Sequence, residues 1–141
     1  MTYMNKIIED LDELNDKMFI VEMAEICHIG DLIMYIRSND DGNTPHFHVY
    51  RKGNRKNTEV CIMFEEPKYF AHGIYKLHRI DSKTVKELDS KLRTVNPKSF
   101  GNPRGEMTYW EQAVSQWNMS TSKKSIPWDL EQPDYTKLNK Q

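Results

Sequence analysis

Residues 44–50 read Thr44-Pro45-His46-Phe47-His48-Val49-Tyr50, and they follow a polar segment, residues 38–43, that is typical of a turn. Residues two apart on a β-strand share one face of the sheet, so the two histidines lie on one face and Phe47 and Val49 on the other. Two imidazoles on one face suit a metal site, an acid–base pair or a structural hydrogen-bonding element. The stretch therefore predicts a strand and marks the first candidate site.

The segments on both sides of this stretch read as further strands. Residues 32–37 are apolar, β-branched and aromatic, and residues 58–64 form a return strand after a hairpin turn at residues 52–55. Residues 19–27 add a fourth candidate strand, and Pro67 ends the series. These segments predict a small antiparallel sheet of three to four strands.

Three segments are predicted to be helical. Apolar residues recur every three or four positions in residues 1–18, and acidic residues lie between them, which predicts an acidic N-terminal helix. A second helix runs over residues 82–95, with Asp81 or Ser82 as its cap. Thr108 and Glu111 have the spacing of a capping box, which begins the last helix. The fold class predicted is α+β, with the N-terminal helix and the two C-terminal helices packed on the sheet.

The chain has 141 residues, which suits one domain. We place this domain at residues 1–117, with the acidic helix at 1–18, the sheet at 19–64 and the helical part at 82–117. Residues 118–141 are polar and lack periodicity, so we expect an extended or disordered tail. Its sparse apolar residues would pin it to its own domain or to a partner; they are Ile126, Trp128, Leu130, Tyr135 and Leu138.

Composition and charge exclude some classes of protein. No apolar run approaches the roughly 18 residues that cross a bilayer, and the first residues do not resemble a signal peptide. Cys27 and Cys61 lie in apolar segments, which favours buried thiols in a cytoplasmic protein. The net charge is −1, but residues 1–50 hold 3 Lys/Arg against 10 Asp/Glu and residues 51–104 hold 13 against 6. A basic middle segment can face phosphates, or both segments can simply be solvated.

Residues 30–117 resemble an uncharacterised domain family of bacteria and phages. The resemblance rests on the Pro45-His46-Phe47-His48-Val49 strand after a Gly and an Asn/Asp turn, and on the hairpin, return strand and Trp-containing helices that follow. Members are often encoded beside toxin–antitoxin-like genes. The acidic N-terminal helix, residues 65–80 and the tail depart from the family's pattern. The resemblance implies a fold and a motif, and no mechanism.

A metal is one reading of the two histidines. His46 and His48 would supply two nitrogen ligands to zinc. No local spacing nominates a third ligand, which would come from one of His28, His72, His78, Asp40 and Asp41. Histidines on strands also serve as structural hydrogen-bonding groups, so we expect no cofactor and keep zinc as the alternative.

Catalysis is a second reading. The strand is faintly similar to the histidine-triad nucleotide hydrolases, but Tyr50 stands at the place of their third histidine, which disfavours that chemistry. A ribonuclease-like toxin would use His46, His48 and Tyr50 as catalytic groups. The hairpin after the strand would bind phosphates through Arg51, Lys52, Arg55 and Lys56, unless it is merely a solvated hairpin tip.

The leading hypothesis is a small accessory or regulatory module that binds a macromolecular partner, RNA or protein, and that does not enter membranes. Self-association is a further expectation. The alternative is an enzyme centred on His46 and His48, either a ribonuclease-like toxin or a metal-dependent hydrolase.

Overall fold

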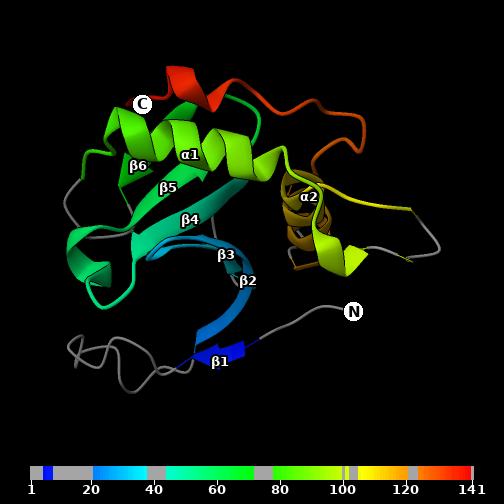
Figure 1. Ribbon diagram of the computed structural model, residues 1–141, viewed down its shortest axis with the longest axis horizontal. Coiled ribbons are helices and arrows are strands. Elements are labelled where there is room, and N and C mark those ends of the chain that lie inside the picture. The colour runs from blue at the N-terminus through cyan, green and yellow to red at the C-terminus, as the bar shows by residue number, and fades with distance from the viewer. Residues whose placement is uncertain are drawn as a thin grey trace.

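The strand that contains His46 and His48 lies at the centre of an antiparallel sheet. The computed structural model describes residues 5–7, 21–37, 44–71, 78–99, 101, 105–120 and 124–140. Five antiparallel strands follow one another in chain order (Figure 1): β2 (Val21–Ile29), β3 (Leu32–Arg37), β4 (His46–Arg51), β5 (Val60–Met63) and β6 (Lys68–Ala71). Two short edge strands extend them: β1 (Asn5–Ile7) pairs antiparallel with β2, and β7 (Asn139–Lys140) pairs parallel with β6.

The α+β class with an antiparallel sheet is confirmed, whereas the expected number of three to four strands is wrong. β6 begins directly after Pro67, where a missing N–H does not interrupt the ladder, and it is too short for a clear sequence pattern. Asn5–Ile7 form a strand in place of the predicted helix. The rest of the predicted helix at residues 1–18 lies outside the described residues.

Both C-terminal helices are present. α1 (Ser82–Leu92) is capped by Asp81, whose carboxylate accepts the backbone N–H of Thr84 at 2.8 Å. α2 (Tyr109–Ser120) begins with the predicted capping box: the Thr108 hydroxyl accepts from the Glu111 N–H, and the Glu111 carboxylate from the Thr108 N–H. The described residues also form three short 3₁₀ helices: η2 (Arg55–Asn57), η3 (Pro97–Ser99) and η4 (Tyr135–Lys137). None of the described helices combines the length and apolar composition needed to cross a bilayer.

Alternation along the strands divides the buried side chains between two faces of the sheet. One face packs with the helices in the main core, to which β4 contributes Phe47 and Val49 and α2 contributes Trp110 and Trp117. The opposite face carries a smaller buried cluster of Ile33, Tyr35 and Tyr50 together with the two histidines. We call this second side the histidine face. As predicted, Phe47 and Val49 lie on one face of the sheet, and His46 and His48 lie on the other.

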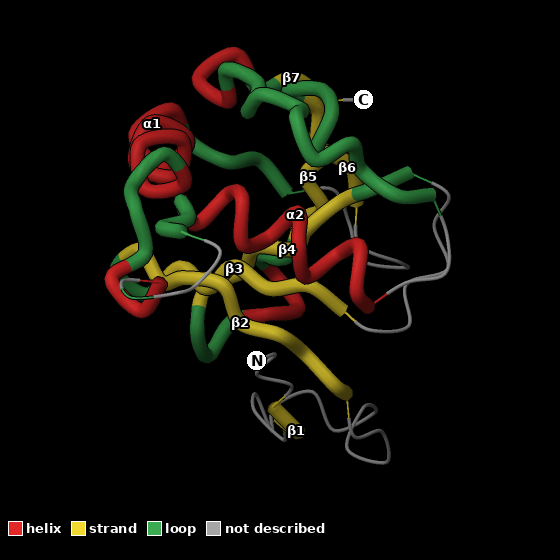
Figure 2. Tube along the Cα trace, turned by 90° about the vertical axis from the view of Figure 1, so that its right-hand side faces the viewer, coloured by secondary structure: helices red, strands yellow, loops and turns green. Residues whose placement is uncertain are grey.

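The C-terminal segment, residues 124–140, packs on this domain. Its last part, near the C-terminus, lies beside α1 (Figures 1 and 2). Ile126 and Tyr135 are buried in the main core. The Tyr135 hydroxyl lies 3.0 Å from the carbonyl oxygen of Met63 and 3.1 Å from that of Phe64, and it accepts the Trp110 indole N–H. The apolar residues of this segment were expected to attach it either to its own domain or to a partner. Ile126 and Tyr135 attach it to its own domain.

Candidate functional site

The histidine face is assembled from three neighbouring strands. In the register of the sheet, His48 of β4 lies opposite Tyr35 of β3 on one side and opposite Cys61 of β5 on the other. All three side chains are at most 2% exposed. His46 lies two residues before His48 and is 4% exposed, so both histidines of the motif are buried.

Glu59 is the polar centre of this face. Its side chain is fully buried, and it lies directly before β5. One carboxylate oxygen accepts from the Tyr35 hydroxyl at 2.5 Å and lies 2.9 Å from His48 Nδ1, and the other accepts from Arg55 Nε at 2.5 Å. A buried carboxylate is costly unless donors and an opposite charge surround it, and these three groups meet that requirement. We call Tyr35, His48, Arg55 and Glu59 the Glu59 network.

Aromatic packing fixes the orientation of the rings. His48 stacks on Tyr35 with ring centroids 4.7 Å apart, and Tyr35 meets Tyr50 edge to face at 5.6 Å. The Arg55 guanidinium lies 5.7 Å from the centroids of both tyrosine rings. Tyr50 thus packs beside the network in a fully buried position.

His46 is held at the beginning of β4. Its Nδ1 lies 2.8 Å from the Thr44 carbonyl oxygen, so the neutral ring carries its proton on that nitrogen. Its ring centroid lies 5.0 Å from that of His48, 5.2 Å from Phe70 and 5.5 Å from Trp117. This ring therefore joins the histidine face to the end of α2.

The arrangement around Cys61 does not match a nucleophilic triad. Such a triad needs the thiol on one ring nitrogen of the histidine and the carboxylate on the other. Here Cys61 Sγ lies 3.6 Å from His48 Nδ1, the nitrogen that also contacts Glu59. Because Cys61 and His48 are also buried, the geometry supports structural hydrogen bonding or metal ligation better than attack on a substrate.

Tyr35 gives this face a pH dependence. Burial, and then the neighbouring Glu59 carboxylate, raise the pKa of Tyr35 well above its ordinary value. The unfolded chain loses this proton near pH 10 while the folded protein retains it, so stability falls as the pH rises above about 10.

Above about pH 10, the free energy of unfolding of Tyr35→Phe should fall less steeply with pH than that of the wild type, by up to ~1.4 kcal/mol per pH unit. The reason is that the variant has no phenol proton at this position to retain. Urea unfolding at a series of pH values up to about 11 measures the slope. Tyr109→Phe, at a half-buried position, is the matched control. The same slope for wild type and Tyr35→Phe would contradict this assignment.

The four basic residues of the predicted binding hairpin divide into two pairs. Arg51 forms an ion pair with Asp31 at 2.5 Å and donates to the Thr84 hydroxyl at 2.9 Å, and Arg55 belongs to the Glu59 network. Lys52 and Lys56 are exposed. The arginines therefore position the hairpin, while the lysines point to its surface.

Two contacts bring the hairpin next to the start of α1. The side chain of Arg51, which precedes Lys52, donates to the hydroxyl of Thr84, which follows Lys83 on the helix. Nε2 of His78, which precedes Arg79, lies 3.3 Å from the Lys56 carbonyl oxygen. We call the exposed set the basic edge: Lys52, Lys56, Arg79, Lys83 and, one helical turn after Lys83, Lys86.

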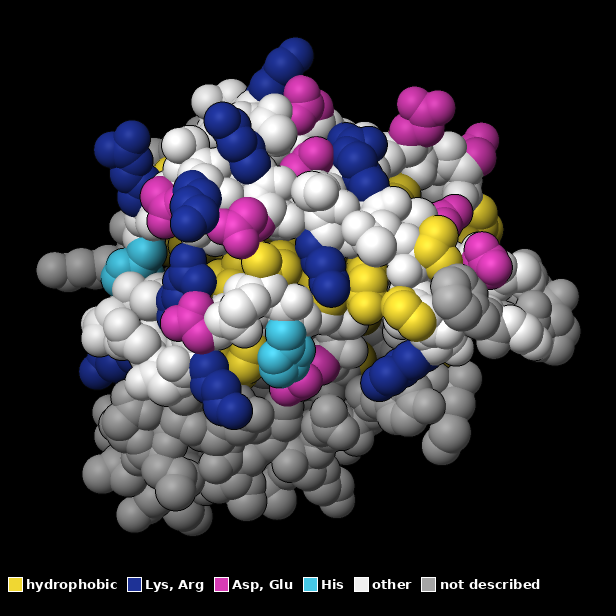
Figure 3. Space-filling model, in the orientation of Figure 1, with side chains coloured by type: hydrophobic (Ala, Val, Ile, Leu, Met, Phe, Trp, Pro, Cys, Tyr) yellow, Lys and Arg dark blue, Asp and Glu magenta, His cyan; other side chains and the backbone are white. Residues whose placement is uncertain are grey.

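The basic edge is not uniformly positive. Asp31, Asp81 and Glu87 are exposed beside it, but Asp31 is paired with Arg51 and Asp81 caps α1. In the space-filling view, Lys and Arg side chains gather more densely on the left half of the face, with Asp and Glu among them (Figure 3). Positive charge still exceeds negative charge on this surface.

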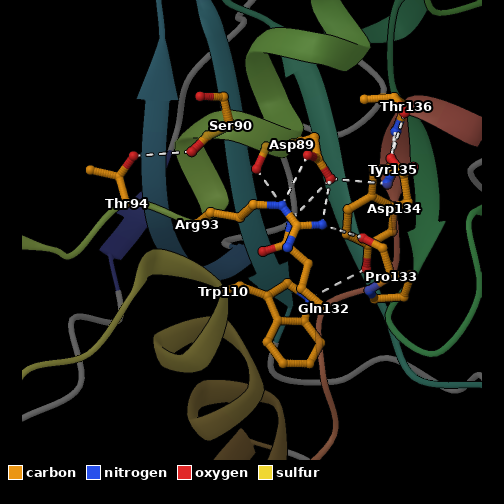
Figure 4. Close-up of polar contacts among 10 residues, drawn as sticks. All are labelled: Asp89, Ser90, Arg93, Thr94, Trp110, Gln132, Pro133, Asp134, Tyr135 and Thr136. Atoms are coloured by element: carbon orange, nitrogen blue, oxygen red, sulfur yellow. Dashed lines mark hydrogen bonds and ion pairs between the residues drawn. The ribbon is translucent and has the colours of Figure 1, made fainter.

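The C-terminal segment fixes α1 and so the lysines that it carries. Asp89 of α1 accepts from the Tyr135 N–H at 3.0 Å and from the Gln132 amide at 3.1 Å, and it pairs with Arg93 (Figure 4). Arg93 in turn donates to the Pro133 carbonyl at 3.2 Å. The segment therefore holds α1 through Asp89 and Arg93.

Sequence reasoning missed Glu59, Cys61 and Tyr35. The sequence predicts strands at Tyr35 and Cys61 and a buried thiol at Cys61, which is confirmed, but no site role for either, and Glu59 has no signal beyond its place beside a strand. Of the third ligands considered for zinc, His28 pairs with Glu25 on an exposed surface and His78 contacts Lys56. His72, Asp40 and Asp41 lie outside the described residues. The catalytic and phosphate-binding roles assigned from the sequence stay predictions.

Comparisons of the chain with protein-family models, curated proteins and solved structures give no match. The family resemblance of the Pro-His-Phe-His-Val strand stays a prediction.

Proposed function

We propose that this protein is a small RNA-binding module that contacts the phosphate backbone through the basic edge. The observation that carries the proposal is that two contacts join the hairpin, which bears Lys52 and Lys56, to the segment that bears Arg79 and Lys83. Residues from two separate parts of the chain thus form one positive surface.

The composition of this surface favours a nucleic acid over a protein partner. Protein interfaces are enriched in aromatic residues, Met and Arg and depleted in Lys, whereas phosphate contacts are made by Lys and Arg. Four lysine or arginine side chains are exposed at Lys52, Lys56, Arg79 and Lys83. The large hydrophobic side chains that are exposed in the described part of the chain, Met119 and Trp128, belong to α2 and the C-terminal segment.

The hairpin is rigid enough to present its lysines in one arrangement. Gly53 takes a positive φ of 78° in the turn, a conformation that glycine adopts without strain. The Thr58 hydroxyl accepts from the Arg51 N–H and donates to the Asn54 carbonyl, so it ties the two arms together. The Glu59 network also fixes the hairpin, because Arg55 of the hairpin donates to the Glu59 carboxylate.

Binding to a short, fluorescently labelled oligouridine tests the proposal by anisotropy. About four phosphate contacts predict a slope of about −3 in a plot of log K against log salt concentration between about 50 and 200 mM. A protein of equal size and net charge without a basic patch serves as the control. Absence of binding at about 50 mM salt, or a flat salt response, would overturn the proposal and leave a protein partner as the remaining reading.

A further inference from the structure

We infer that His46, His48 and Cys61 form a binding site for a zinc ion on the histidine face. The three residues each offer one ligand atom, and these atoms all lie within 4.8 Å of one another. The site is separate from the basic edge, so it does not depend on the proposed RNA binding.

The register of the sheet creates this cluster. His46 and His48 share a face because they are two residues apart on β4, and Cys61 joins them because the β4–β5 pairing sets it opposite His48. Two imidazoles and one thiolate are a ligand set that zinc prefers. The structure thus supplies the third ligand that the sequence could not nominate.

Hydrogen bonds orient both histidines as metal-binding histidines are oriented. Such a ring commonly donates one N–H to a carboxylate or a backbone carbonyl and ligates through its other nitrogen. His48 Nδ1 lies 2.9 Å from the Glu59 carboxylate, and His46 Nδ1 lies 2.8 Å from the Thr44 carbonyl. With Nδ1 held in this way, Nε2 of each ring is the nitrogen that would bind the ion.

Binding requires a small contraction of the cluster. Zinc–nitrogen bonds near 2.0 Å and a zinc–sulfur bond near 2.3 Å place neighbouring tetrahedral ligands roughly 3.4–3.6 Å apart. The ligand atoms lie within 4.8 Å of one another, so binding needs movements of roughly 1 Å. The Cys61 thiol releases its proton to solvent as the zinc–thiolate bond forms.

No fourth His, Cys, Asp or Glu of the described residues joins the group. A water molecule would complete the tetrahedron, as in three-ligand zinc sites. Trp117 and Phe70, whose rings lie against His46, surround the site with apolar groups.

Cobalt(II) titration of the folded, metal-stripped wild-type protein tests the ligand set without any variant. We expect a sulfur-to-cobalt charge-transfer band and tetrahedral d–d bands that saturate at about one ion per chain and disappear when zinc is added. Absence of the charge-transfer band would overturn the inference.

Variants then identify the thiolate. Cys61→Ser should lose the charge-transfer band and lower zinc binding at least tenfold, whereas Cys27→Ser, the matched change at the other buried cysteine, should retain both. His46→Gln should weaken zinc binding to a similar degree. Zinc affinity equal to that of the wild type in a folded Cys61→Ser variant would also overturn the inference.

Discussion

Replacing Glu59 with alanine should lower the free energy of unfolding by about 3–5 kcal/mol, the range found when one partner of a buried ion pair is removed. The change leaves Arg55, His48 and Tyr35 without the acceptor that they share. Arg55 has only 11% of its side chain exposed, so water restores little of the lost solvation. Urea unfolding followed by circular dichroism measures the effect.

The variant Glu59→Gln removes the negative charge of this side chain but keeps its size, so it shows how much of the stability depends on the charge. The amide keeps the size and one acceptor but cannot accept from all three donors, so a smaller loss of about 1–3 kcal/mol is expected. Glu66→Ala is the control, because its contact with Lys68 at 3.8 Å lies on the surface and should contribute less than about 1 kcal/mol. A loss for Glu59→Ala no larger than that of the control would contradict the structural role of the network.

Trp117→Ala should also lower the free energy of unfolding by about 3–5 kcal/mol, because it removes the largest fully buried side chain of the described residues and leaves a cavity. Trp117 packs against Phe64 and His46, and its indole N–H donates to the Lys124 carbonyl at 2.8 Å. It therefore connects α2 to the sheet, to the histidine motif and to the C-terminal segment.

Trp128→Ala provides the comparison for this second prediction. The Trp128 side chain is 69% exposed, so its removal should change stability by no more than about 0.5 kcal/mol. Both variants are measured by urea unfolding with circular dichroism, since the loss of a tryptophan alters fluorescence directly. Equal costs at the two positions would contradict the packing described for Trp117.

Local sequence patterns predicted the elements whose signals are local. The composition of Leu32–Arg37 predicted β3 to the residue, and the spacing of Thr108 and Glu111 predicted the capping box of α2. The alternation of His46 to Val49 predicted which side chains share a face. Each of these signals depends on neighbours within a few positions.

The partners of the histidines could not be predicted in the same way. The turn between β4 and β5 contains η2 and irregular chain, so its length does not reveal that His48 pairs with Cys61. Glu59 is an acidic residue beside a strand, a pattern that usually indicates solvent exposure. Only the fold brings Tyr35, 24 residues away in the chain, to its carboxylate.

The C-terminal segment shows the same limit. Its apolar residues are too sparse for a periodic signal, yet Tyr135 reaches the carbonyl of Met63 across 72 positions. Such contacts depend on the topology of the whole fold, so they cannot be predicted from local sequence propensities.

We propose that the basic edge binds RNA, whereas the histidine face stabilises the fold. The most direct test compares oligouridine affinity at about 50 mM salt for the double variants Lys52→Glu/Lys83→Glu and Lys98→Glu/Lys137→Glu, which make equal changes of net charge at exposed lysines. We expect the first pair to lose affinity on the order of 10- to 100-fold at an unchanged melting temperature, and the second to lose less than about threefold. Equal losses in both variants, or no loss in the first, would contradict the claim.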